Sequence, residues 1–260
     1  MFTHNLDPIL INLGFISLRW YSLAYIFGIL IGWWYGKKII KKFQNKNSNL
    51  LADDFDDLIT YLIFGIVIGG RVGYVIFYNL NYYIENPLDI IKIWQGGMSF
   101  HGALIGIIIG TFFFSYRRDK NALFFLDIIA CVSPIGIFFG RIANFINGEL
   151  VGKISSMPWS VIFPNVDMMP RHPSQIYEAV LEGVILFLIV NFFINKKEYI
   201  IGTCSYVFLI SYGALRIVSE FFREPDLQLG YIFNIASMGS ILSFVMFLSG
   251  IAMFYIVKKR

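Results

Sequence analysis

Charged residues are scarce in this sequence. Asp, Glu, Lys and Arg together make up only 15% of its 260 residues, whereas an ordinary soluble domain carries roughly 25%. Hydrophobic residues make up 57%. This composition excludes a soluble globular domain and predicts a protein that crosses a membrane several times.

Residues that bind metals are also few, with two cysteines and three histidines. Cys131 and Cys204 lie in apolar runs, so we expect buried thiols rather than a disulfide or a metal site. No HExxH motif or paired Cys/His spacing occurs. The sequence therefore predicts no metal and no cofactor. The small net charge of +4 does not indicate nucleic-acid binding.

Seven apolar runs are long enough to span a bilayer, which takes about 20 helical residues. They lie at residues 18–36, 58–78, 98–116, 122–141, 177–195, 199–218 and 233–257. We therefore expect an all-α integral membrane protein with seven transmembrane helices, forming a single transmembrane domain over residues 1–260.

Basic residues are concentrated after the first, third, fifth and seventh runs. Because positively charged loops stay in the cytoplasm, this pattern predicts an external N-terminus and a cytoplasmic C-terminus. The 13 residues concerned, of 21 lysines and arginines in total, are Lys37, Lys38, Lys41, Lys42, Lys46, Arg117, Arg118, Lys120, Lys196, Lys197, Lys258, Lys259 and Arg260.

Arginine predominates among the other eight basic residues, six of which are arginines. They are Arg19, Arg71, Lys92, Arg141, Lys153, Arg171, Arg216 and Arg223. The planar arginine fork binds phosphate or carboxylate through two hydrogen bonds. Several of these arginines lie within or at the ends of apolar runs, so we expect an anion site on the outer side. Snorkelling to the outer interface is the alternative.

The external loop at residues 142–176 is predicted to fold as a small cap inserted in the transmembrane domain. It contains four prolines and the strand-like stretch WSVIF. Its mixture of aromatic and apolar residues is unlike that of a flexible linker.

The stretch GRIANFINGELVG places polar groups directly after an apolar run. Arg141 and Asn144 share one helix face, where they present a cation and an amide donor. Asn147 and Glu149 follow. Either these groups bind a ligand, or Glu149 pairs with Arg141 as a structural bridge.

The stretch GALRIVSEFFREPD carries Tyr212, Arg216, Glu220 and Arg223 at helical spacing. We expect one polar stripe on a helix that Pro225 ends. Glu220 is expected to bridge to both arginines. Because two arginines surround one glutamate, the stripe predicts positive charge that the glutamate does not neutralise and that could bind an anionic ligand.

His101 and Tyr25 complete the candidate groups. A histidine within a membrane helix is a functional candidate, and its titration near neutral pH suits proton transfer. A hydrogen-bonded packing histidine is the alternative. Tyr25 lies deep enough to need a partner, which Arg141 or a ligand headgroup could supply. The predicted topology places these residues, with Arg71 and Arg216, in one outward layer.

Four motifs in this order resemble the prolipoprotein diacylglyceryl transferase family: GGMSFHG, GRIANFINGELVG, RHPSQIYEA and EFFREPD. The resemblance extends from RWYSLAY to the last apolar run. It implies an enzyme of the bacterial inner membrane, surrounded by membrane lipids, with a periplasmic cap and an active site towards the periplasm. Its implied reaction moves the diacylglyceryl group of phosphatidylglycerol to the lipobox cysteine of a prolipoprotein. The family's important positions correspond to Tyr25, His101, Arg141, Asn144, Glu149, Gly152, Tyr212, Arg216, Glu220 and Arg223.

The implied reaction suggests a role for each catalytic candidate. We expect Arg141 and Arg216 to hold the phosphate while Asn144 orients it. His101 is the expected base for the thiol. Alternatively, His101 only positions lipid, and the field of the arginines activates the thiol.

Two glutamates, Glu149 and Glu220, are expected to orient the arginines.

The alternative function is a transporter or flippase of an anionic lipid, which would need a continuous polar path across the membrane. The inner halves of the apolar runs offer little polarity beyond Asp127, and this argues against transport.

Overall fold

The chain forms two compact units in this computed structural model. The structure describes residues 2–14, 17–44, 50–225, 231–232 and 236–259. The first unit comprises Met1–Tyr35 and Asp127–Arg260, and the second comprises Gly36–Leu126. Helices α1 (Trp20–Gln44) and α5 (Ala122–Asn147) each carry residues of both units.

The second unit is built on the close packing of helices α2 (Asp54–Tyr78) and α4 (Phe100–Arg118). Glycines lie where the two backbones meet. A Cβ at Gly106 would lie 1.9 Å from the carbonyl oxygen of Gly65, so only glycine permits this approach. An apolar groove of about 760 Å³ runs beside the contact, and none of the predicted site residues lines it.

Arg71 of α2 organises the loop that precedes α4. This loop contains α3 (Leu80–Glu85), η1 (Pro87–Ile91) and η2 (Ile93–Gln95). The buried Arg71 guanidinium donates hydrogen bonds to the carbonyl oxygens of Asp89 at 2.6 Å, Ile90 at 2.8 Å and Gly96 at 2.6 Å. Arg71 therefore satisfies backbone carbonyls of this loop, and its place in an outward layer with the other arginines stays a prediction.

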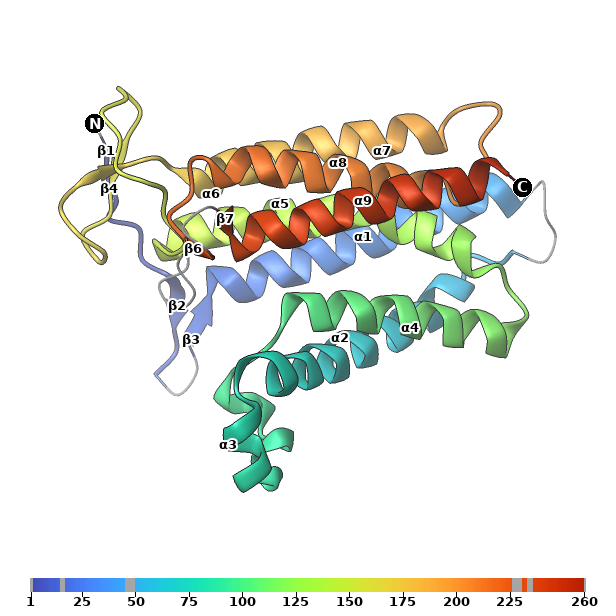
Figure 1. Cartoon of the computed structure of the whole chain (residues 1–260), viewed down its shortest axis with the longest axis horizontal. Helices are drawn as coiled ribbons and strands as arrows, with labels where there is room; N and C mark the ends of the chain where they lie inside the picture. Colours follow the sequence, from blue (N-terminus) through green and yellow to red (C-terminus); the bar gives the residue numbers. More distant parts are fainter. Residues whose placement is uncertain (1, 15–16, 45–49, 226–230, 233–235, 260) are drawn as a thin grey trace. The chain divides into compact units, whose positions relative to one another are not determined.

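The helices of the first unit lie side by side (Figure 1). Besides α1 and α5, they are α6 (Ser174–Glu178), η3 (Ala179–Ile185), α7 (Leu186–Ile194), α8 (Thr203–Glu220) and α9 (Met238–Lys258). Helices α6, η3 and α7 follow one another without a break, as a single helical segment over residues 174–194. Small residues allow α8 and α9 to approach closely, because a Cβ at Gly213 would lie 2.6 Å from the carbonyl oxygen of Ser243.

The prediction of a helical membrane protein is confirmed. Among the described residues, four helices are long and apolar enough to cross a membrane: Asp54–Tyr78, Ala122–Asn147, Ser174–Ile194 and Met238–Lys258. Each of the seven predicted runs overlaps a helical segment, although seven crossings and their orientation stay predictions. The last run began at residues 233–235, which lie outside the described residues, as do Lys46, Asp226 and Arg260.

Some helix ends differ from the predicted ones. Helix α1 continues to Gln44, because lysines in its last turn are favourable at a helix C-terminus. Helix α5 continues to Asn147, six residues past the predicted end. Gly148, with a φ of 64°, follows it and turns the chain.

Asp127 links α5 to the start of α8. Its buried carboxylate accepts hydrogen bonds from the backbone N–H groups of Gly202 and Ser205, each at 2.6 Å, and from the Ser205 hydroxyl at 2.6 Å. The Tyr199 hydroxyl also donates to it. A side chain of one helix thus caps the N-terminus of another.

Short strands occupy one end of the first unit (Figure 1). Strand β4 (Val161–Ile162) pairs in parallel with β1 (Phe2–Thr3) and antiparallel with β5 (Pro170–Arg171). Two further pairs of strands are antiparallel: β2 (Ile9–Asn12) with β3 (Ser17–Arg19), and β6 (Tyr231–Ile232) with β7 (Ala236–Ser237). The strand predicted at WSVIF is therefore present, and the all-α description omits this small sheet. That residues 142–176 form a periplasmic cap stays a prediction.

Candidate active site

Arg141 projects from the last turns of α5 towards two carboxylates of the helical segment 174–194. Its NH1 atom lies 2.8 Å from Glu178 Oε2, and its NH2 atom lies 3.0 Å from Glu182 Oε2. Both glutamates are fully buried. Their spacing of four residues places both carboxylates on one helix face, within reach of a single guanidinium.

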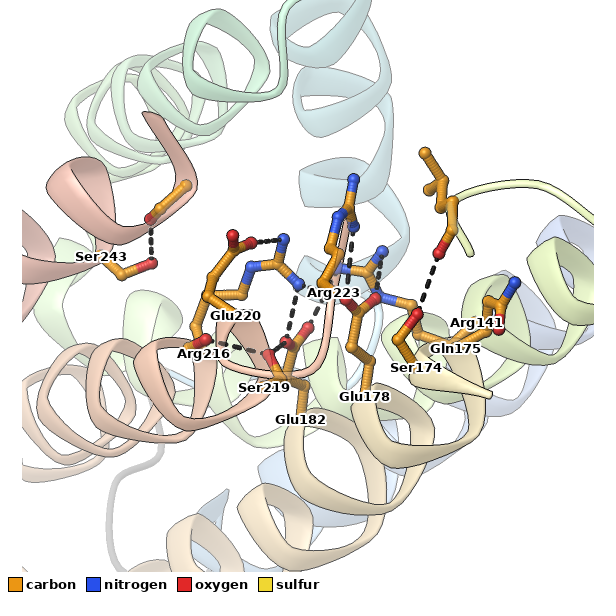
Figure 2. A network of polar contacts seen from close by, with 12 residues as sticks. Arg141, Ser174, Gln175, Glu178, Glu182, Arg216, Ser219, Glu220, Arg223 and Ser243 are labelled. Carbon is orange, nitrogen blue, oxygen red and sulfur yellow. Dashed lines mark hydrogen bonds and ion pairs between the residues drawn. The ribbon is translucent and has the colours of Figure 1, made fainter. Parts of the chain in front are cut away.

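Arg216 of α8 contacts the same two carboxylates (Figure 2). Its NH1 atom donates to Glu178 Oε1 at 2.7 Å and to Glu182 Oε1 at 3.1 Å. Its NH2 atom also contacts Glu220, one helical turn further along α8. Arg141, Glu178, Arg216 and Glu182 therefore form a closed arrangement of alternating charge, which we call the arginine ring.

Arg223 reaches the ring from outside α8. The sequence predicted it on the helical stripe, but α8 ends at Glu220, before Pro225. Instead, Arg223 forms an isolated β-bridge with Gly152, and its NH1 atom lies 3.3 Å from Glu178 Oε1. The chain turns sharply after α8, so backbone pairing rather than helical periodicity places this side chain.

The charges of this cluster balance. Three arginines face three glutamates: Arg141, Arg216 and Arg223 with Glu178, Glu182 and Glu220. The predicted surplus of positive charge was wrong, because it counted Glu220 alone. Two carboxylates four residues apart in an apolar helix were a signal for Glu178 and Glu182, since charges there are costly without partners.

Glu149 lies in a turn after α5 and is hydrogen bonded to Asn144. The Asn144 amide donates to Glu149 Oε1 at 2.7 Å, and the Gln175 amide donates to the Glu149 carbonyl at 2.6 Å. Gly148 and Leu150, on either side, both have positive φ. Arg141 has its ion pairs with Glu178 and Glu182 instead. The structure thus differs both from the expected Glu149 brace and from the alternative Glu149–Arg141 bridge.

Gly152 occupies a crowded backbone position. A Cβ there would lie 2.3 Å from the His172 carbonyl oxygen and 2.7 Å from that of Phe222. Its N–H group donates to the His172 carbonyl at 3.1 Å, and its own carbonyl accepts from Arg171 NH1 at 2.9 Å. Only glycine permits this meeting of three chain segments, which brings Arg223 to the ring.

The two candidate tyrosines differ in environment. Tyr25 is exposed, and its hydroxyl lies 3.5 Å from that of Tyr21, one turn away on α1. The expected pairing of Tyr25 with Arg141 is not among the described contacts. Tyr212 is buried, and its ring stacks on Phe208 with 5.6 Å between the centroids.

His101 belongs to the second unit, in the first turn of α4, where it is half-buried. Ser99 caps this helix by accepting a hydrogen bond from the Gly102 N–H at 3.2 Å. The other predicted site residues all belong to the first unit. Within the described ranges, no group of three or more His, Cys, Asp or Glu side chains is arranged to hold a metal ion.

A family model described as prolipoprotein diacylglyceryl transferase matches residues 8–256. The chain belongs to the prolipoprotein diacylglyceryl transferase family. This membership confirms the predicted enzyme, a diacylglyceryl transferase, against the transporter or flippase considered from the sequence.

Curated relatives agree with this family. Proteins named phosphatidylglycerol–prolipoprotein diacylglyceryl transferase from Rickettsia felis and Rickettsia typhi are both 49% identical to the chain, over 250 and 252 residues. The first match covers 95% of each protein, and the second covers 96%. The relative of that name from Rickettsia bellii is 47% identical over 257 residues, covering 98% of this chain and 95% of its own length.

Proposed function

We propose that this protein transfers the diacylglyceryl group of phosphatidylglycerol to the lipobox cysteine of prolipoproteins, the first step of bacterial lipoprotein maturation. The thiol loses its proton, its sulfur bonds to a glyceryl carbon, and the bond between that carbon and a phosphate oxygen breaks. The phosphate oxygen keeps the electron pair, and the proton balances the released glycerol phosphate. The products are a thioether and glycerol phosphate.

The observation that carries this proposal is that Arg141, an arginine of the family signature, belongs to the arginine ring. The signature supplies Arg141 and Asn144, and the ring joins Arg141 to Arg216 through Glu178 and Glu182. A guanidinium has five N–H groups, and the two carboxylates need only some of those of Arg141. The remaining donors suit the oxygens of a phosphodiester and of the leaving phosphate, where negative charge develops.

Activation of the thiol needs a separate group. A free cysteine has a pKa of about 8.5, so a base or a positive field must raise its thiolate fraction near neutral pH. The ring is a poor candidate for the base, because its carboxylates are paired with arginines. We therefore retain His101 as the base, and keep activation by the arginine field as the alternative.

The proposed setting is the inner membrane of a bacterium. The lysine-rich loops support seven crossings with the N-terminus outside and the C-terminus in the cytoplasm. On that topology, the strands near residues 142–176 form a periplasmic cap, and the arginine ring lies towards the periplasm. Phosphatidylglycerol and the lipobox segment of a signal peptide would both reach the site from the membrane.

A reconstituted reaction tests the proposal. Purified protein in detergent micelles is mixed with phosphatidylglycerol and a synthetic lipobox peptide, and released glycerol phosphate and peptide mass are followed together. We expect equal amounts of glycerol phosphate and diacylglyceryl peptide. A peptide with serine in place of the lipobox cysteine is the control and should stay unmodified. Folded protein that releases no glycerol phosphate would overturn the proposal.

A further inference from the structure

The carboxylates of the arginine ring have no obvious use in binding an anion. Glu178 and Glu182 lie within 3.1 Å of Arg216 and within 3.0 Å of Arg141. Arginines alone would bind a phosphate more tightly, because the glutamates cancel their charge. Some other requirement must explain two buried carboxylates at this place.

Burial makes the cancellation effective. Glu178 and Glu182 are 0% exposed, and Arg216 is 8% exposed. Water screens charges weakly at such buried positions. Each unit of net charge in the cluster therefore strongly affects how tightly an anion binds there. The six-residue cluster as a whole is neutral, with Glu220 and Arg223 adding one charge of each sign.

The proposed reaction changes the charge of the phosphate. Phosphatidylglycerol is a phosphodiester with one negative charge. Glycerol phosphate is a phosphomonoester with a second pKa near 6, so it carries close to two negative charges at pH 7. A neutral cluster tolerates the single negative charge of the phosphodiester substrate and disfavours the second negative charge of the phosphomonoester product. A positively charged cluster would instead retain the product.

We propose that Glu178 and Glu182 set the charge of the site so that it binds the monoanionic phosphodiester and releases the dianionic phosphomonoester product. This inference rests on the proposed function. It assigns the two glutamates to substrate–product discrimination, a role distinct from holding the arginines in place.

Glu182→Gln is the first test, because glutamine keeps the shape of the side chain and removes its charge. Initial rates at pH 7 give the KM for phosphatidylglycerol and the inhibition constant of added glycerol phosphate. We expect that inhibition constant to fall about tenfold or more, as close charge pairs produce effects of this size. The KM should fall less, because the substrate carries one charge. Glu182→Asp, which keeps the charge, should leave the ratio of the two constants near that of the unmodified protein.

Matched controls separate charge from structure. Asp57→Asn removes a carboxylate from the Arg118 ion pair in the second unit, and it should leave both constants unchanged. Thermal unfolding in micelles establishes that each variant is folded. A folded Glu182→Gln protein with an unchanged ratio of the two constants would overturn the inference.

The unmodified protein gives a second test, which holds even if the Gln variant does not fold. Glycerol phosphate is compared as an inhibitor with its methyl phosphodiester, which carries one charge. We expect the diester to inhibit at lower concentration, and stronger inhibition by the monoester would overturn the inference. If the unmodified protein transfers nothing to the peptide, the proposed function itself fails, and this inference fails with it.

Discussion

Arg216 of α8 and Glu178 of α6 are 38 positions apart in the chain, and Arg216 NH1 lies 2.7 Å from Glu178 Oε1. Both side chains are buried. Two segments that are distant in sequence are therefore joined by a charge pair inside the protein, where removing one partner leaves the other uncompensated.

Arg216→Ala should both destabilise the protein and abolish transfer. Removing this arginine leaves Glu178, Glu182 and Glu220 short of a partner, which we expect to cost about 3–5 kcal/mol. Thermal unfolding in micelles measures the first effect, and glycerol phosphate release measures the second. Arg216→Lys keeps the charge but not the fork, so it should unfold near the normal temperature and still lose about 100-fold in kcat/KM. Transfer by Arg216→Ala would contradict the phosphate-binding role.

His101→Gln tests the assignment of the base. If His101 takes the thiol proton, kcat/KM at pH 7 should fall by about 100-fold or more. The loss should shrink as the pH approaches the pKa of a free thiol, about 8.5, because the peptide then ionises without help. Normal turnover of His101→Gln at pH 7 would instead favour activation by the arginine field.

Asp127→Ala should loosen the start of α8. The Asp127 carboxylate accepts from both backbone and hydroxyl groups of Ser205 and from the Gly202 N–H. Their loss leaves buried donors unsatisfied, and we expect a fall of about 2 kcal/mol or more in the free energy of unfolding. Asp127→Asn retains one acceptor oxygen, so its free energy of unfolding should lie between those of the unmodified protein and of Asp127→Ala. Equal unfolding temperatures for all three proteins would show that this cap is unimportant.

Gly152→Ala should disturb the chain crossing near the cap. The new Cβ would meet the carbonyl oxygens of His172 and Phe222, and relieving such a clash commonly costs about 1–3 kcal/mol. We expect faster proteolysis of the loop and a loss of transfer, since Arg223 pairs with Gly152. Gly136→Ala is the control, because no atom of the described residues, apart from the chain neighbours and nearby backbone of its own helix, lies within 4 Å of the added Cβ.

The Asp167–Arg171 pair predicts a pH dependence of the loop between α5 and α6. The Arg171 guanidinium, whose NH2 lies 2.6 Å from Asp167 Oδ2, holds the pKa of Asp167 below its ordinary value of 3.8. A carboxyl with a lower pKa in the folded state stabilises it above the unfolded pKa and stops doing so as the pH falls through the folded pKa. The unfolding temperature of the unmodified protein minus that of Asp167→Asn should be constant near neutral pH and shrink below about pH 4. A difference that is unchanged down to pH 2 would contradict this role.

The sequence was sufficient to predict the helices and part of the site. Long apolar runs must be helical in a bilayer, since no other open structure satisfies the backbone there, and this holds for α2 and α5. Arg141, Asn144 and Arg216 stood out because polar groups at the ends of apolar runs are costly without a purpose.

The partners of those residues could not be deduced in the same way. Glu178 and Glu182 are 37 and 41 positions from Arg141, and no local rule relates side chains so far apart. Arg223 kept helical spacing with Arg216, yet α8 ended before it. The environment of Arg71 depends on how a neighbouring loop folds back over it, and a period of 3.6 residues carries no information about that.

The arginine ring also bears on how the protein is synthesised. A nascent chain that ends before α8 contains Arg141, Glu178 and Glu182 but lacks Arg216, Glu220 and Arg223. This partial set has a net charge of −1, so it should repel an anionic lipid headgroup. The later residues contribute +1 and neutralise it. We therefore expect the growing chain to bind phosphatidylglycerol at this site only once translation has passed Arg223.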